Sequence, residues 1–177
     1  MLNCPGCGAP MRLEDGRDTL VCDYCGQISV PEANDDGVRI LGEASTLACP
    51  VCASPLVQAA MARHRILYCT HCRGTLIGMG EFGALIGDLR AEAHGAEEIP
   101  RPPAPRELQR HIRCPQCGTT MDTHFYAGPG NVVIDDCSRC ALNWLDAGEL
   151  RTIAHAPDHS YTHESRSISD YGFGFES

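Results

Sequence analysis

Twelve cysteines are the residues of this 177-residue chain whose type and spacing point most directly to chemistry. All of them fall in Cys-x-x-Cys pairs, which join two by two across gaps of 14, 16 and 19 residues. Two such pairs about 15–20 residues apart have the spacing typical of a four-cysteine zinc site. The sequence therefore predicts three zinc ions, with these ligands: Cys4, Cys7, Cys22 and Cys25; Cys49, Cys52, Cys69 and Cys72; Cys114, Cys117, Cys137 and Cys140.

The residues around the pairs suit a metal-binding turn. Zinc takes four soft ligands in a tetrahedron, with each sulfur at about 2.3 Å. The opening turns read Cys-Pro-Gly-Cys-Gly, Cys-Pro-Val-Cys-Ala and Cys-Pro-Gln-Cys-Gly. Proline fixes φ in such a turn, and a small residue after the second cysteine permits a close backbone approach.

Three alternatives compete with zinc. A disulfide framework suits an even cysteine count, but the N-terminal residues lack the apolar stretch of a signal peptide. We therefore expect a reducing, cytoplasmic location, which favours metal over disulfides. Redox-active Cys-x-x-Cys pairs normally occur singly at a helix N-terminus, whereas six regular pairs look like ligands. Iron of the rubredoxin kind stays open, because ligand spacing hardly separates it from zinc.

The cysteine tetrads predict a small zinc-stabilised β protein made of three tandem Cys4 zinc ribbons, the second and third each followed by a short α-helix. Each ribbon is below the size at which a hydrophobic core usually suffices, so zinc binding would supply folding free energy. We expect ribbon 1 at residues 1–44, ribbon 2 plus its helix at 45–98, a Pro/Arg linker at 99–109, ribbon 3 plus its short helix at 110–156, and a disordered tail at 157–177.

Turn and helix signals place the elements within these modules. Asp15-Gly16 predicts a hairpin turn in ribbon 1, and residues 37–41 allow a further short strand. Apolar residues at 82, 85, 86 and 89 predict an amphipathic helix over 81–92. Asp146 and Glu149 have the spacing of a capping box, which predicts a helix ending before Pro157. The proline-rich stretch 99–105 predicts a stiff linker, so we expect ribbon 3 to move independently.

The modules are repeats, and ribbon 3 carries a longer motif. Its second cysteine pair is followed by Trp-Leu-Asp-x-Gly-Glu-Leu at 144–150. With its opening Cys-Pro-x-Cys, the third module resembles the bacterial zinc-finger family named after the ribbon of transcription factor IIB. Ribbon 2 looks like a degenerate copy, with Leu76-Ile77-Gly78 in place of Trp-Leu-Asp, and ribbon 1 resembles a generic zinc ribbon. The resemblance implies zinc ligation by the cysteines, a zinc-ribbon fold and a link to transcription.

The charge of the chain disfavours binding to nucleic acid. The formal net charge is −9, and lysine is absent. Twelve thiolates and three Zn²⁺ would bring the charge to about −15. Nucleic-acid affinity depends mainly on basic contacts to phosphate. The one arginine cluster is read as a solvated linker rather than a phosphate site: Arg101, Arg106, Arg110 and Arg113.

Several other residues could form metal or partner sites, but a structural or solvent-exposed role is the simpler interpretation for each. His155, His159 and His163 follow a helical spacing that Pro157 interrupts, so we interpret them as part of a solvated tail. His71 stands inside the 69–72 turn and is expected to be exposed. Trp144 is expected to pack near Leu150 rather than serve a partner. The acidic run at 32–36 is read as a solubilising loop, and the aromatic stretch 171–175 as disorder or a docking peptide.

These observations predict a protein without catalytic activity. Four cysteines close each zinc site, whereas a catalytic zinc keeps a position open for water. We expect a cytoplasmic adaptor or accessory subunit that mediates protein–protein interaction in a larger complex, with no membrane-spanning segment. A transcription-associated factor contacting RNA polymerase or nucleic acid is the first alternative. An iron-binding electron-transfer protein is the second.

Overall fold

The computed structural model describes residues 2–14, 19–93, 102 and 105–157. Its strands form two sheets. The smaller sheet is ribbon 1, an antiparallel arrangement in the order β1-β2-β3. Its strands are very short: β1 (Arg12–Leu13), β2 (Leu20–Val21) and β3 (Ile28–Ser29). The turn predicted at Asp15-Gly16 lies outside the described residues, but the strands on either side of it pair as expected.

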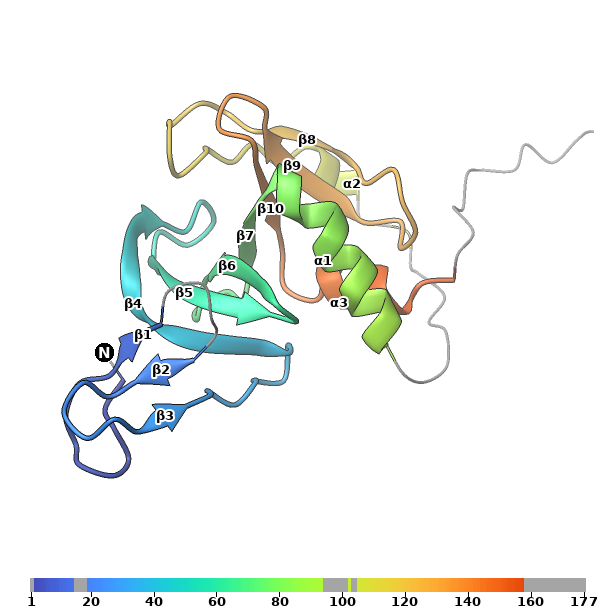
Figure 1. Ribbon diagram of the computed structural model, residues 1–177. Coiled ribbons are helices and arrows are strands. Elements are labelled where there is room, and N and C mark those ends of the chain that lie inside the picture. Colours follow the sequence, from blue (N-terminus) through green and yellow to red (C-terminus); the bar gives the residue numbers. More distant parts are fainter. Residues whose placement is uncertain (1, 15–18, 94–101, 103–104, 158–177) are drawn as a thin grey trace, which may run out of the picture.

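The larger sheet contains the strands of both other ribbons in the order β4-β5-β6-β7-β10-β9-β8 (Figure 1). Its strands are β4 (Val38–Ala48), β5 (Pro55–Met61), β6 (His64–Tyr68), β7 (Thr75–Gly78), β8 (Asp122–Phe125), β9 (Val133–Cys137) and β10 (Leu142–Leu145). Ribbons 2 and 3 meet where β7 pairs antiparallel with β10. The independent motion predicted for ribbon 3 is therefore wrong, because backbone hydrogen bonds join it to ribbon 2.

The strand expected near residues 37–41 is much longer than predicted. It is β4, which continues to Ala48 and pairs with β5 of ribbon 2. The boundary expected between ribbons 1 and 2, after Ala44, lies within this strand. Register shifts between Ile40 and Ala48 mark irregular pairing along it. Strand β4 thus begins at the end of ribbon 1 and continues into ribbon 2.

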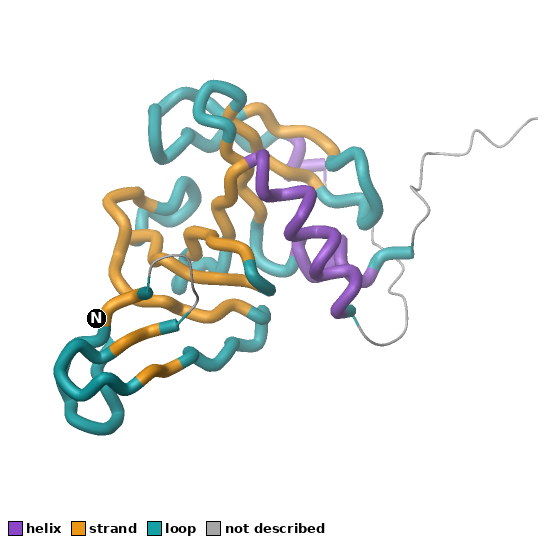
Figure 2. The backbone as a smooth tube through the Cα atoms, viewed as in Figure 1, coloured by secondary structure: helices purple, strands orange, loops and turns teal. Residues whose placement is uncertain are grey.

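Two of the three helices in the described part of the chain lie side by side (Figure 2). They are α1 (Met79–Glu92) and α3 (Glu149–His155), and a short α2 (Pro105–Leu108) precedes ribbon 3. The apolar stripe predicted for α1 is confirmed, because Phe82, Leu85 and Ile86 are buried. Arg90 Nη1 also donates to the Ile153 carbonyl oxygen at 2.7 Å, which joins the ends of the two long helices.

Successive residues of the large sheet point to two different cores. Ile77 of β7 and Leu145 of β10 belong to the cluster that contains the buried residues of α1 and α3. Their neighbours Leu76 and Trp144 belong to a cluster that contains cysteines of ribbons 2 and 3. Side chains alternate between the faces of a strand. One face of the larger sheet therefore packs on the helices, and the other packs on the cysteine tetrads.

Ribbons 2 and 3 are related by a local two-fold pattern. Leu76 and Trp144 each stand four residues after the last cysteine of their ribbon. They are direct partners in the β7–β10 register, with Ile77 opposite Asn143 and Thr75 opposite Leu145. The two strands occupy the same place in their repeats, and their pairing is centred on residues that also match. The helices that follow them, α1 and α3, pack together as well. The two repeats therefore associate within one chain as a symmetric dimer would.

Candidate metal centres

The structure brings all twelve predicted ligands into three tetrads. Within each tetrad the four Sγ atoms lie within 4.8 Å of one another. A tetrahedron with sulfur at about 2.3 Å from zinc has sulfur–sulfur edges of about 3.8 Å, and a disulfide holds its sulfurs about 2.05 Å apart. The observed distances fit the tetrahedron: 3.6 Å for Cys4–Cys25, 3.5 Å for Cys7–Cys22, 3.4 Å for Cys49–Cys72, 3.4 Å for Cys52–Cys69 and 3.7 Å for Cys117–Cys137.

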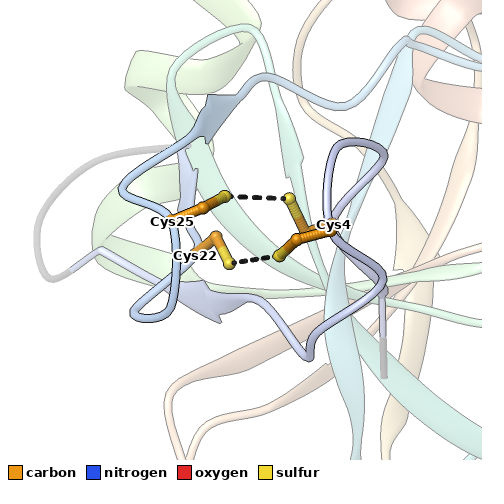
Figure 3. A group of neighbouring side chains, drawn as sticks. Cys4, Cys22 and Cys25 are labelled. Carbon is orange, nitrogen blue, oxygen red and sulfur yellow. Dashed lines mark hydrogen bonds between the residues drawn. The ribbon is translucent and has the colours of Figure 1, made fainter.

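The ligands sit on two facing turns in each ribbon. In ribbon 1, Cys22 and Cys25 face Cys4 across the space between the turns (Figure 3). Backbone N–H groups of such turns also point at sulfur, since Val51 N lies 3.4 Å and Cys52 N 3.5 Å from Cys49 Sγ. These donors offset the negative charge of a thiolate, so they favour the metal-bound form of the ligand.

A left-handed residue follows every cysteine pair. The value of φ is +76° at Gly8, +73° at Gly26 and +71° at Gly118, and it is also positive at Ala53, Arg73 and Ala141. In ribbon 2, Arg73 N donates to the Cys69 carbonyl oxygen at 2.8 Å, which closes the turn. The small residue is predicted for the opening turns, and Arg73 shows that a closing turn accepts a large one. What the turn needs is a positive φ, which glycine adopts most easily.

Thiol groups of one tetrad differ in how readily they lose a proton. The hydroxyl and N–H of Ser54 lower the pKa of Cys52 to about 5. In ribbon 3, Thr119 lowers the pKa of Cys117 to about 6, and its Oγ1 lies 3.4 Å from Cys117 Sγ. Burial raises the pKa of Cys72. Because zinc binds thiolates, these donors favour binding at neutral pH, and binding releases the protons that remain.

The cysteine ligands of ribbon 1 are less buried than those of ribbons 2 and 3. Cys7 and Cys25 are exposed, whereas the corresponding ligands of ribbons 2 and 3 are partly buried. The core behind this site contains few residues, with Met11 and Leu20 beside Cys4 and Cys22. Ribbons 2 and 3 instead share one cluster of apolar side chains that spans both of their tetrads. The three sites therefore differ in protection from solvent.

Trp144 lies between the two shared sites. It is fully buried beside cysteines of both ribbons, with Leu56, Leu76 and Met121. The packing predicted near Leu150 is wrong, because Leu150 belongs to the cluster on the opposite, helical face. Gly74 makes room for the indole, since a Cβ at that position would lie 2.1 Å from Trp144 Cζ2. The alternation of β10 sends Trp144 toward the zinc ribbons and Leu145 toward the helices.

A partly buried network of charged side chains contacts Trp144 in ribbon 3. Trp144 Nε1 donates to Asp146 Oδ1 at 3.0 Å. Arg110 pairs with the other oxygen of Asp146 and with Asp135, whose side chain has no exposed surface. The interpretation of Arg110 as part of a solvated linker is therefore wrong. Arg106 and Arg113 remain exposed, and Arg101 lies outside the described residues.

The predicted capping box forms in part. Asp146 N donates to Glu149 Oε2 at 2.6 Å, which is the half contributed by the glutamate. Gly148 is the N-cap of α3, with no side-chain hydrogen bond of its own, and the Asp146 carboxylate contacts Trp144 and Arg110 instead. Burial raises the pKa of Glu149 to about 8. Glu149 is therefore largely protonated at neutral pH.

The acidic run is more than a solubilising loop. Asp36 Oδ2 accepts hydrogen bonds from the Tyr68 hydroxyl at 2.6 Å and from Arg73 Nε at 2.7 Å. The Arg73 side chain lowers the pKa of Asp36, and burial raises the pKa of Tyr68 to about 12. These contacts attach the loop to the last zinc turn of ribbon 2. Sequence spacing gave no sign of this contact, because Asp36 and Arg73 lie 37 residues apart.

The histidines take no part in the tetrads that the structure describes. His71 is exposed on the 69–72 turn, as expected. His155 lies in the last turn of α3. His159, His163 and the aromatic stretch 171–175 lie outside the described residues, as does most of the 99–105 linker. No described helix is long and apolar enough to cross a membrane.

Two antiparallel sheets, facing Cys-x-x-Cys turns and closed tetrads define a protein of tandem zinc ribbons with three zinc sites. Residues 113–156 match the family model described as transcription factor zinc-finger, that of the transcription factor IIB zinc ribbon. The third ribbon is thus of this family, as its Trp-Leu-Asp-x-Gly-Glu-Leu motif predicted. Comparisons with curated proteins and with solved structures give no match.

Proposed function

We propose that this chain is a non-catalytic, cytoplasmic zinc-binding adaptor or accessory subunit that mediates protein–protein interaction in a larger complex. The closed zinc sites support a structural role for the metal, because four cysteines leave no position for a substrate or an activated water. Each ion would hold two turns at a fixed separation. The surfaces around those turns are then rigid enough to be recognised by another protein.

The observation that carries this proposal is the exposed apolar stretch of ribbon 1. Tyr24, Ile28 and Val30 are 85%, 62% and 58% exposed. Tyr24 stands on the turn between Cys22 and Cys25, and Ile28 lies on β3, one of the two edge strands of the small sheet. Single exposed apolar residues are ordinary, whereas several large ones within seven residues favour an interaction site.

A nuclease-treated pull-down from the cells that express the protein tests this proposal. We expect one stoichiometric protein complex, identified by mass spectrometry. Tyr24→Ala combined with Ile28→Ser should reduce its recovery, while Val51→Ser, which changes an exposed apolar residue of ribbon 2, should not. Zinc content of each variant reports whether ribbon 1 still folds. Absence of any stoichiometric protein from the wild-type preparation would refute the adaptor role.

The family of ribbon 3 favours a second candidate, a transcription-associated factor that contacts RNA polymerase or nucleic acid. The charge argues against autonomous nucleic-acid binding, and Arg110 is already paired with two aspartates. This candidate predicts polymerase subunits in the pull-down. It also predicts salt-sensitive nucleic-acid binding that falls when exposed Arg106 and Arg113 are neutralised. The adaptor role predicts no such binding.

A further inference from the structure

A cleft of about 250 Å³ lies where the first two ribbons and the two long helices come together. One wall is the acidic loop around Asp35 and Asp36, and the last turn of α1 and residues along α3 also line the cleft. Its floor is apolar and buried, with Val38, Met61 and Leu150. The cleft is separate from all three zinc tetrads.

The acidic wall is held in place by its own hydrogen bonds. Asn34 Oδ1 accepts from Asp36 N at 3.0 Å and from Val38 N at 2.9 Å, and Gly37 N donates to the Asn34 carbonyl oxygen at 2.8 Å. Asp36 is attached to Tyr68 and Arg73 of ribbon 2. A cleft whose wall is fixed in advance loses little conformational entropy when it binds.

The rim of the cleft carries an excess of negative charge. Among the residues that the structure describes, Asp36 and Asp146 pair with Arg73 and Arg110. No described basic residue pairs with Asp35 or Glu92, both of which are exposed. Glu92 also ends α1, and the C-terminus of a helix attracts cations.

The lining also contains Arg151 and His155, but its four carboxylates outnumber its two arginines, Arg73 and Arg151. Arg151 is already engaged in an interaction, and His155 is the last residue of α3. Asp35 of the acidic loop and Glu92 at the end of α1 both line the cleft, and neither pairs with a cation among the residues that the structure describes. A cation placed between them would face two carboxylates above an apolar floor.

We propose that this cleft binds a basic side chain, arginine or lysine, that projects from an apolar segment of a protein partner. The aliphatic stem would pack on Val38, Met61 and Leu150, while the charged head lies between Asp35 and Glu92. Long basic side chains combine these two parts. This proposal rests on the adaptor role and specifies which kind of side chain the partner would insert. The chain's net charge of −9 favours a basic partner in the same way.

Fluorescein-labelled eleven-residue peptides provide the test. Each peptide has leucine on both sides of a central arginine, lysine, glutamine or glutamate, and binding to the zinc-loaded full chain is measured by anisotropy. Asp35→Asn combined with Glu92→Gln removes the two available rim charges. Glu32→Gln combined with Glu107→Gln is the matched control, because both of its sites lie outside the lining. Zinc content and circular dichroism establish that every variant is folded.

We expect the arginine and lysine peptides to bind and the glutamate peptide not to bind. The rim variant should weaken that binding about fivefold, and added salt should weaken it further, while the control pair stays within about twofold of wild type. Equal binding of all four peptides, binding of none, or equal losses in the two variants would overturn the cleft proposal. If the pull-down still recovers a complex, the adaptor role survives that result.

Discussion

Trp144 lies directly opposite Leu76 in the β7–β10 pair, and both residues occupy the same position of their repeats. The pairing is therefore centred on equivalent residues, as at a two-fold axis. The repeats differ where they meet, since ribbon 2 has Gly74 beneath the indole and ribbon 3 has Leu142 at the matching position. Gly74 of ribbon 2 thus leaves space for the tryptophan of ribbon 3.

Adding a methyl group at Gly74 should disrupt this contact. The Cβ of Gly74→Ala would lie 2.1 Å from Trp144 Cζ2, and the ring has little room to move in a core that holds two zinc tetrads. We expect a loss of about 1–3 kcal/mol in the free energy of unfolding, typical of an overpacked core. Urea unfolding of the zinc-loaded protein, followed by tryptophan fluorescence, measures it.

Gly83→Ala is the matched control for that substitution. Gly83 is exposed in the middle of α1, and its added Cβ would meet no atom within 4 Å. We expect stabilisation of about 0.5–1 kcal/mol, the difference in helix propensity between the two residues. A Gly74→Ala protein as stable as the wild type would show that Trp144 does not lie against this turn.

Removing Arg110 should destabilise ribbon 3 strongly. Asp135 has no exposed side-chain surface and pairs with Arg110, so Arg110→Ala leaves a buried carboxylate without its cation. We expect a loss of about 3–5 kcal/mol in the free energy of unfolding. Arg113→Ala, on an exposed arginine three residues away, should change it by less than about 0.5 kcal/mol. Equal effects would mean that Arg110 belongs to a solvated linker after all.

Glu149 should make stability fall as the pH rises through neutrality towards 8. Its pKa is raised from 4.5 to about 8 in the folded chain, mainly by burial. The folded state therefore holds the proton more tightly than the unfolded state, so this stabilisation is complete below about pH 4.5 and is lost as the pH rises through 8. Glu149→Gln keeps an oxygen to accept the Asp146 N–H but does not titrate.

Unfolding between pH 6.5 and 9 tests this expectation under conditions in which zinc stays bound. The wild type should lose stability relative to Glu149→Gln across that range, with a slope of at most about 1.4 kcal/mol per pH unit. Glu107→Gln, on the short helix α2, is the control and should follow the wild type. Parallel curves for wild type and Glu149→Gln would contradict a half-buried, protonated Glu149.

The zinc sites could be predicted from the sequence because ligand spacing within a ribbon is a local property. Cys-x-x-Cys pairs and their turns bring the sulfurs together regardless of how the ribbons pack against one another. The same local reasoning found α1, since the apolar stripe at 82, 85, 86 and 89 faces one core.

The association of the ribbons could not be predicted in this way. The repeat was visible in the sequence, but nothing local showed that β7 and β10 would pair with each other. A proline-rich linker suggested separation, and composition alone assigned Arg110 to it. Arg110 and Asp36 act instead through partners that are distant in sequence, Asp135 and Arg73. Both pairs are long-range contacts that spacing cannot reveal.

Native mass spectrometry during timed chelation of the intact chain is the most direct test of three zinc ribbons, two of which share a core. We predict three zinc ions per colourless protein at the start. The first ion should leave ribbon 1, where Cys7 and Cys25 are exposed, and the other two should then leave nearly together, because each site supports the shared cluster around Trp144. Fewer than three ions at the start, bound iron, or a long-lived species with one ion would contradict this arrangement.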